Sequence, residues 1–218
     1  MSICAKCPTM GCTTKDESKM PKKLCPSRDL ELQEKAKSLY IDENLKIEKE
    51  ATLVEGEGKC NWTRVQEIIV FAKKMGYKKV GVAFCMGLHE EAKTFVKILE
   101  YHGLEVVSIG CKNGATLKGF LGIPQEEKEH YVKNDMMCNP IGQALYLNKQ
   151  DIDLAILLGL CVGHDTLFLK YAEMPITIFA VKDRVLCHNP LGAIYQADAY
   201  YKKKCLMMNI KFYILALD

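Results

Sequence analysis

Long apolar runs are missing from this chain of 218 residues. The longest, Leu154–Gly163, is much shorter than the roughly 20 residues that a membrane helix needs, so the sequence predicts no transmembrane segment. The N-terminus, Met1–Cys7, lacks the apolar core of a secretory signal peptide. Together these two absences predict a cytoplasmic protein with no membrane partner.

An excess of one charge is also missing. The 30 Lys and Arg residues nearly balance the 27 Asp and Glu residues, which leaves a formal net charge of +3. No long basic stripe carries interleaved aromatic residues, so the sequence predicts no nucleic-acid partner. A phosphate-binding loop is missing as well, because the glycines of Val54–Gly58 lack the strand–helix context of a dinucleotide site.

Cysteine, in contrast, is abundant, with 11 residues in the chain. Disulfides are rare in the cytoplasm, so these thiols are expected to be metal ligands, catalytic groups or inert core residues. Most of them lie beside Gly, Pro or His, which favours a chemical role over simple packing. Cys60 and Cys205 lack such neighbours and are interpreted as structural.

Four cysteines stand close together near the N-terminus: Cys4, Cys7, Cys12 and Cys25. A Cys-x2-Cys pair followed by two further thiols is typical of a metal site. Prolines directly follow Cys7 and Cys25, which favours a [4Fe–4S] cluster. Zinc ribbons share this feature, so zinc is the alternative. Residues 1–28 are too polar to fold by burial alone, and we predict a Cys-rich module that its metal holds together.

Residues 29–218 show helical and strand patterns in alternation, which predicts an α/β domain. The pattern indicates a Rossmann-like, doubly wound, mostly parallel sheet with helices on both faces. The predicted strands are 79–84, 104–109, 154–158, 176–181 and 209–217. The predicted helices are 29–50, broken by the glycines of 55–58, and then 63–75, 90–102, 139–149, 165–172 and 189–201.

A second set of cysteines is spread along this domain. Cys85, Cys111 and Cys161 directly follow predicted strands, and Cys138 precedes an Asn-Pro helix start. Ligands of doubly wound folds bind outside the carboxyl ends of the strands, so we expect these four thiols to meet there. A soft set of thiolates selects an iron–sulfur cluster or zinc. The alternative is that two or three of these residues are core cysteines and one is a nucleophile.

Three further residues are predicted to contact the cofactor. Gly87 and Gly163 follow the strand-end cysteines and allow a close approach of the backbone. His164 is expected to act as a ligand, a proton donor or a helix cap. The charged run Lys182–Arg184 ends another predicted strand, where it would either hold an anionic substrate or form a solvated surface.

Two short motifs occur twice in the domain. The Cys-x-Gly of 85–87 recurs at 161–163, and the Cys-Asn-Pro of 138–140 recurs at 187–190 with an inserted His. This repetition predicts an internal duplication of the ranges 80–148 and 154–203. In that duplication, residues 111–137 are an insertion that covers the inner site.

Five stretches of the chain, together with the N-terminal cysteines, resemble those of a known family: Val54–Gly58, Trp62–Val65, Gly81–Leu88, Gly159–Asp165 and Lys182–Pro190. The family is a bacterial and archaeal group of uncharacterised metal-binding proteins catalogued as domain of unknown function 1847. The resemblance implies a cytoplasmic metal protein typical of anaerobes, and it implies no particular reaction. The family pattern has Gly in place of Cys187, which implies that Cys187 is a less essential ligand than Cys85 or Cys161.

These observations predict an iron–sulfur protein with redox or reductive chemistry at the inner thiolate site, to which the N-terminal cluster relays electrons. The expected partner is an electron-donor protein or a small-molecule substrate. One alternative is a non-enzymatic module that binds zinc or another metal for storage, sensing or delivery. The other is an α/β enzyme with a structural zinc and a Cys nucleophile. The sequence leaves open the metal, the substrate, the role of Cys187 and the oligomeric state.

Overall fold

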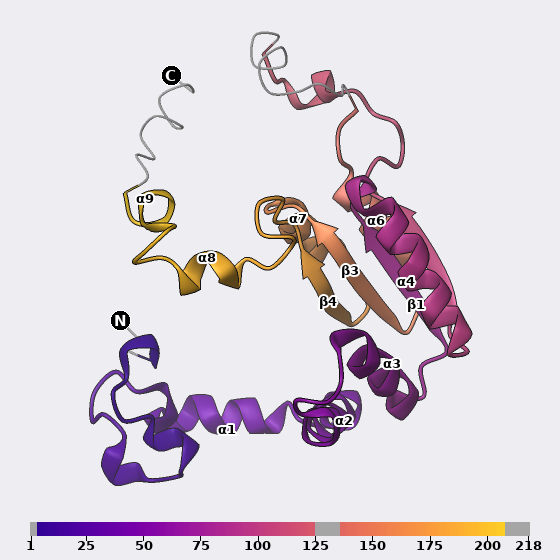
Figure 1. The fold of residues 1–218 in the computed structure, drawn as a ribbon. Helices are drawn as coiled ribbons and strands as arrows, with labels where there is room; N and C mark the ends of the chain where they lie inside the picture. Colours follow the sequence, from indigo (N-terminus) through magenta and orange to yellow (C-terminus); the bar gives the residue numbers. More distant parts are fainter. Residues whose placement is uncertain (1–3, 125–135, 208–218) are drawn as a thin grey trace. The chain divides into compact units, whose positions relative to one another are not determined.

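A computed structural model describes residues 4–124 and 136–207 (Figure 1). The chain divides into two compact units, Met1–Asn61 and Trp62–Asp218. The first unit therefore includes the predicted metal-binding module of residues 1–28 and two helices that follow it. The second contains the predicted α/β fold.

The first unit begins with short 3-10 helices and continues into two α-helices. Its elements are η1 (Cys4–Lys6), η2 (Gly11–Thr13), η3 (Glu17–Lys19), η4 (Pro26–Arg28), α1 (Leu30–Ser38) and α2 (Asp42–Gly58). The prediction of one helix over 29–50 was wrong, because the chain becomes extended at Ile41 and the Asn44 side chain donates a hydrogen bond to the Leu39 carbonyl. The predicted break at 55–58 was too early, since α2 continues through Gly56, at a cost of about 1 kcal/mol, and ends at Gly58.

The second unit contains a sheet whose strands were predicted nearly to the residue. Within the described residues, four strands form one sheet in the order β2-β1-β3-β4, and every pair is parallel. The strands are β1 (Lys79–Phe84), β2 (Glu105–Gly110), β3 (Leu154–Leu160) and β4 (Ile176–Val181). The predicted α/β architecture is therefore confirmed.

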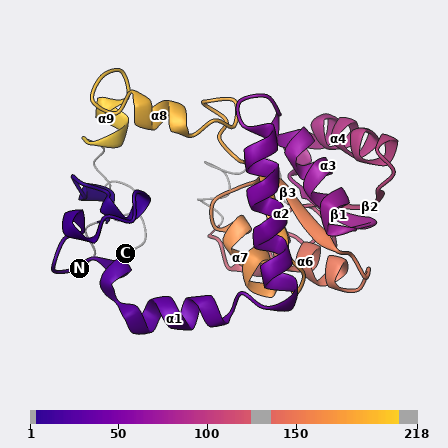
Figure 2. The ribbon, with the colours of Figure 1, turned by 90° about the horizontal axis from the view of Figure 1, so that it is seen from below.

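Helices cover both faces of this sheet, as the doubly wound pattern requires. They are α3 (Arg64–Met75), α4 (His89–Tyr101), α6 (Pro140–Asn148) and α7 (His164–Tyr171). Helix α3 starts with the predicted capping box between Thr63 and Gln66 and ends at Gly76, where φ is +76°. Figure 2 shows α3 and α4 on one side of the strands and α6 and α7 on the other.

Alternation along the strands divides the buried residues into two cores. Val80 and Val82 of β1 pack in the core that α3 and α4 cover, whereas Ala83 packs in the core of α6 and α7. Strand β3 alternates in the same way, with Ile156 in the first core and Leu157 in the second. Every residue of β3 is buried, because helices cover both faces of the sheet. A strand buried on both faces has apolar residues at consecutive positions, as the sequence of β3 does.

The winding of the chain reverses between β1 and β3. From β1 the chain crosses through α4 to β2 at one edge, and then returns through α6 to β3 on the other side of β1. Such a reversal opens a crevice outside the carboxyl ends of the two central strands, where ligands of doubly wound folds bind.

The chain after β4 differs from the prediction. A helix was expected over 189–201, but α8 (Leu191–Tyr195) is short, and turns lead from it to α9 (Lys202–Cys205). Helix α8 buries none of its residues, so it lacks the tertiary packing that lengthens most helices. The predicted strand over 209–217 lies outside the described residues. None of the helices in the described ranges is long and apolar enough to cross a membrane.

Candidate functional site

Cys85 and Cys111 lie next to each other at the ends of neighbouring strands. Phe84 of β1 is paired with Gly110 of β2, so the residues that follow them are also adjacent. The Cys111 N–H donates to the Phe84 carbonyl at 2.9 Å, which extends the strand pairing by one residue. Both cysteines are buried. The parallel register thus creates a thiol pair that no sequence spacing encodes.

Cys138 reaches the same edge through the loop that precedes α6. The Asn139 N–H donates to the Cys111 carbonyl at 2.7 Å. The side chains of Asn113 and Asn139 also bond to each other at 3.1 Å, and the Asn139 side chain caps α6 at the Gly142 N–H. These contacts hold Cys138 beside Cys111 although 27 positions separate them in the numbering of the chain.

Cys161 follows β3 on the other side of β1. The pairing of β3 with β4 shifts register on both sides of Leu158, and Gly159 has a φ of +67°. This irregularity moves Leu160 from the first core to the second. Beyond it, the Arg184 Nη2 donates to the Cys161 Sγ at 3.5 Å.

All four predicted inner-site cysteines line one pocket in the second unit. Its volume is about 660 Å³, within the range of about 300–1,000 Å³ that is common for small-molecule sites. Charged side chains from the ends of two strands, β2 and β4, and from α4 share the pocket with the thiols. Its lining residues are Cys85, Met86, Gly87, Leu88, Glu91, Cys111, Lys112, Cys138, Cys161, Lys182, Arg184 and His188.

The thiols of Cys85 and Cys111 titrate as a pair. Their hydrogen bond lowers the pKa of the Cys85 thiol from 9.0 to about 5, against the opposing effect of burial, and the Gly87 N–H and Lys182 lower it further. The same hydrogen bond, followed by burial, raises the pKa of Cys111. The pair therefore loses its first proton readily and retains its second. The two shifts together favour a single thiolate on the pair.

Two backbone N–H groups donate to the sulfurs of this pair. The Met86 N–H donates to the Cys111 Sγ at 3.4 Å, and the Gly87 N–H donates to Cys85. The turn η5 (Met86–Leu88) directs them, and it leads directly into α4. Such hydrogen bonds to sulfur are one of the means by which proteins stabilise iron–sulfur clusters and tune their reduction potential.

The predicted cofactor contacts differ in their placement. Gly87 lines the pocket, and a Cβ built on it would lie 3.8 Å from the Cys85 Sγ. Gly163 precedes α7 with a φ of +83°, and neither it nor His164 is among the residues described as lining the pocket. Burial, and next the charge of Lys112, lower the pKa of His164, so its imidazole is neutral at neutral pH. Cys187 is exposed, whereas the neighbouring His188 lines the pocket.

The four N-terminal cysteines surround a cavity of their own in the first unit. Cys4, Cys7, Cys12 and Cys25 all line it, and its volume is about 70 Å³. A cavity needs about 10–15 Å³ to hold one water molecule, so this cavity is larger than a single water requires. The Thr9 and Met10 backbones, in that order, lower the pKa of Cys7 through hydrogen bonds. The four closely spaced cysteines thus line one cavity, and whether they bind a metal stays a prediction.

The donor sets of both cavities suit a soft metal or an iron–sulfur cluster, because each brings four thiols to one space. In residues 4–124 and 136–207, no group of three or more His, Cys, Asp or Glu side chains is already arranged to hold a metal ion. The fit therefore rests on the chemistry of the donors and on the space between them.

Several residues of the inner site were missed by sequence reasoning. Gln143 is completely buried, and its side-chain nitrogen donates to the carbonyls of Phe84 and Ile109, which joins the ends of β1 and β2 beneath the thiols. Lys112 donates to the Met136 carbonyl and lines the pocket. A polar residue on the apolar face of α6 was the available signal for Gln143.

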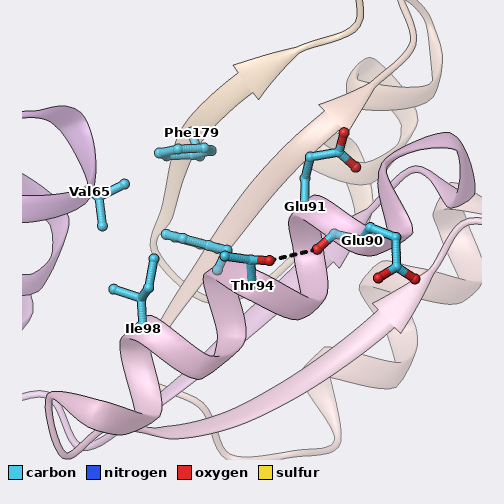
Figure 3. Close-up of a pocket in the computed structure, with 7 residues that line it drawn as sticks. Val65, Glu90, Glu91, Thr94, Ile98 and Phe179 are labelled. Atoms are coloured by element: carbon cyan, nitrogen blue, oxygen red, sulfur yellow. Dashed lines mark hydrogen bonds between the residues drawn. The ribbon is translucent and has the colours of Figure 1, made fainter.

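A second pocket in this unit has a different character. It measures about 400 Å³ and lies between α3, α4 and β4 (Figure 3). Phe95 stacks on Phe179 with ring centroids 4.7 Å apart, and Val65 and Ile98 add apolar surface. No thiol lines it among the described residues. Glu91, at its rim, also lines the thiol pocket.

Comparison with known proteins places the chain among similar sequences. The model of a family described as "Protein of unknown function (DUF1847)" matches residues 25–179. The "Uncharacterized protein MJ0455" of Methanocaldococcus jannaschii is 50% identical over 168 residues, which cover 76% of this chain and 82% of that protein. The family match includes the inner-site cysteines from Cys85 to Cys161 and ends before Lys182 and Arg184.

Proposed function

Because the chain belongs to the DUF1847 family of proteins of unknown function, we propose its function from the site itself: it is an iron–sulfur protein whose inner pocket carries redox or reductive chemistry on a small molecule. One observation carries the proposal. Four cysteines from four separate segments of the chain line a single pocket at the switch point of a parallel sheet.

The residues around the thiols support a negatively charged cofactor. Cys85, Cys111 and Cys138 would hold it from the β1–β2 side, and Cys161 from the β3 side. The N–H groups of Met86 and Gly87 already donate to two of these sulfurs. A bound cluster would supply one-electron transfer, which no protein side chain here provides. The protein would orient the substrate in the pocket and exclude part of the water.

The N-terminal cysteines are proposed as a second thiolate site of the same kind. They surround a cavity, and the segment that carries them has short 3-10 helices and few buried residues. A segment with so little apolar burial gains its stability from a bound metal. In this proposal the site holds a cluster that exchanges electrons with a donor protein.

A different function is favoured by the Cys85 thiol. This residue is buried at the end of β1, hydrogen-bonded to Cys111 and close to the Lys182 ammonium, which together stabilise a thiolate. Such an environment is also that of a cysteine nucleophile. In this second candidate the protein is an enzyme with covalent chemistry at Cys85, and zinc holds the N-terminal segment.

Metal analysis of protein purified without oxygen tests these functions. An iron–sulfur protein will be brown, contain iron and acid-labile sulfide, and lose its visible absorption on exposure to oxygen. A colourless protein with stoichiometric zinc at both sites contradicts the proposal and favours a metal-binding module for storage, sensing or delivery. Zinc at the N-terminal site alone, with rapid alkylation of Cys85, favours the nucleophile.

A further inference from the structure

The thiol pocket contains more positive than negative side chains. Lys112, Lys182 and Arg184 line it together with one acidic residue, Glu91. Lys112 already donates to the Met136 carbonyl. Lys182 and Arg184 are different, because in the described part of the chain neither forms an ion pair with a carboxylate.

Asp183 lies between these two cations but does not neutralise them. Its carboxylate accepts hydrogen bonds from the N–H groups of Val185 and Leu186, at 3.0 and 2.9 Å. The backbone N–H of Asp183 donates to the Nδ1 of His188, and the backbone N–H of His188 donates to the Asp183 carbonyl. In this turn after β4, the Asp183 carboxylate therefore bonds to the backbone of the turn. It does not pair with Lys182 or Arg184, whose side chains line the pocket.

The Lys182 ammonium lies near two glycines, Gly87 and Gly159. A Cβ built on Gly159 would lie 3.6 Å from the Lys182 Nζ and would overlap the Cδ1 of Leu88. A Cβ built on Gly87 would lie 3.9 Å from the same Nζ. Gly159 also needs its positive φ of +67°. The Lys182 ammonium therefore lies close to the backbone at both glycines and beside the Cys85 thiol.

Arg184 is placed at the open side of the pocket. Its side chain is exposed, and its Nη2 donates to the Cys161 Sγ at 3.5 Å. A guanidinium has five N–H donors in a planar fork, so one contact with sulfur leaves the others available. That fork matches the two oxygens of a carboxylate or a phosphate.

We propose that Lys182 and Arg184 form an anion-binding subsite, which holds a carboxylate or phosphate group of the substrate next to the thiols. The anion would bridge the two cations and place the rest of the substrate over Cys85 and Cys161. Which reaction the bound substrate undergoes rests on the proposed function. Binding of the anion itself depends only on the Lys182 and Arg184 side chains.

An alternative role for the cations is to offset the charge of the thiolates. Two contacts fit it, since Lys182 lies beside Cys85 and Arg184 beside Cys161. Charge compensation alone, however, predicts that an added anion has no saturable site. It also predicts that Arg184→Lys behaves like the unmodified protein, because the charge is kept.

Calorimetric titration with three probe anions distinguishes these roles. Inorganic phosphate, acetate and succinate are each titrated in low-chloride buffer into the full-length protein, both as purified without oxygen and after chelator treatment. Metal content is measured in the same samples. The variants are Arg184→Gln, Arg184→Lys and Lys182→Gln, with the exposed Lys149→Gln on the opposite end of α6 as the matched control.

Saturable binding of at least one probe is expected. Loss of a hydrogen bond to a charged group weakens binding about tenfold or more, so Arg184→Gln and Lys182→Gln should raise the Kd by at least that factor. Arg184→Lys should give a smaller loss, and Lys149→Gln none. Preference for phosphate or for the carboxylates identifies which group the substrate carries.

Three outcomes overturn the subsite: no saturable binding to the unmodified protein, equal loss in Lys149→Gln, or full binding by Arg184→Gln. If iron and acid-labile sulfide are present and no probe binds, the subsite fails while the proposed function stands. If no metal is found but Arg184→Gln still abolishes probe binding, the proposed function fails while the subsite stands.

Discussion

Cys85 and Cys111 are neighbours because Phe84 and Gly110 are paired, and the Cys111 N–H continues this pairing to the Phe84 carbonyl at 2.9 Å. Their hydrogen bond lowers the pKa of Cys85 and raises the pKa of Cys111, which favours a single thiolate on the pair. Cys138 and Cys161 complete the lining from either side.

Removing one inner cysteine should empty one site and leave the other filled. Cys85→Ser or Cys161→Ser is expected to reduce the iron and sulfide content to what the N-terminal site alone binds. Cys7→Ser should give the reciprocal loss, since Cys7 lines the N-terminal cavity. Elemental analysis of anaerobic protein checks this, with the exposed Cys205→Ser as the control. Unchanged metal in both Cys85→Ser and Cys161→Ser means that the inner site does not bind metal.

The thiol pair should make the stability of the metal-free, reduced protein depend on pH. The pKa of Cys85 is lowered to about 5 from 9.0, so between these values the folded state binds fewer protons than the unfolded state. Folding stability from this group is therefore present at pH 9 and is lost as the pH falls through about 5. Above pH 9 the raised pKa of Cys111 reverses the slope.

Urea unfolding at several pH values measures this effect as the difference between the unmodified protein and Cys85→Ser. The difference should grow as the pH rises from 5 to 9. A difference that is constant over this window would show that Cys85 keeps an ordinary pKa.

Gln143 should position the thiols through the strand ends. Its side-chain nitrogen donates to the Phe84 carbonyl at 3.1 Å and to the Ile109 carbonyl at 2.8 Å. Gln143→Leu fills a similar volume but removes both bonds, which is expected to cost about 1–3 kcal/mol of unfolding free energy. It should also lower the affinity of the inner site for metal.

Chemical unfolding with a constant m-value measures the stability change, and a chelator competition measures the metal affinity. The matched control is Gln196→Leu, because Gln196 is exposed. Stability and metal retention equal to those of the unmodified protein would rule out the positioning role.

Gly159→Ala should be more harmful than an ordinary glycine substitution. The residue has a φ of +67°, and an added Cβ would overlap the Cδ1 of Leu88. Gly103 has a similar φ of +84° but no atom within 4 Å of its Cβ position. Gly103→Ala is therefore expected to cost about 1–2 kcal/mol from backbone strain alone, and Gly159→Ala clearly more.

Gly56→Ala supplies the opposite control. Gly56 lies inside α2 with open space around its Cβ position, so Ala should stabilise by up to about 1 kcal/mol. Thermal unfolding of the three variants ranks them. A Gly159→Ala protein as stable as Gly103→Ala would show that Leu88 can move aside at no cost.

The N-terminal segment should depend on its metal for order. Residues 4–28 contain short 3-10 helices and few buried side chains. Chelation, or Cys12→Ser, is expected to make this segment sensitive to limited proteolysis while the second unit stays resistant. Mass spectrometry of the fragments locates the cuts. Equal protection with and without chelator would mean that the segment is ordered by its own contacts.

Local patterns predicted the elements that contribute to the site. Lys79–Phe84 and Ile176–Val181 were predicted with their observed bounds, because apolar strands between charged or glycine-rich turns give a strong periodic signal. The helix break at Leu39–Ile41 and the short α8 were not predicted. Both lie where few side chains are buried, so the helical pattern had no packing to support it.

The inner site was predicted only in part. That Cys85, Cys111 and Cys161 follow strands could be read from the chain, and so could the Asn-Pro start after Cys138. Gln143 could not be assigned a role, because the carbonyls it binds belong to two strands that are more than 30 positions earlier in the chain. The contact between Arg184 and Cys161 likewise depends on how β3 and β4 pair.

The sequence alone determined the fold class, the order of the strands along the chain and the presence of cysteines at their carboxyl ends, since these follow from local periodicity and from residue type. The tertiary structure decided which ends are neighbours. Strand register places Cys111 beside Cys85, the irregularity at Gly159 redirects the chain before Cys161, and the turn at Asp183 turns Lys182 and Arg184 toward the pocket. These are contacts between distant segments, and they form only when the two cores pack against opposite faces of one sheet.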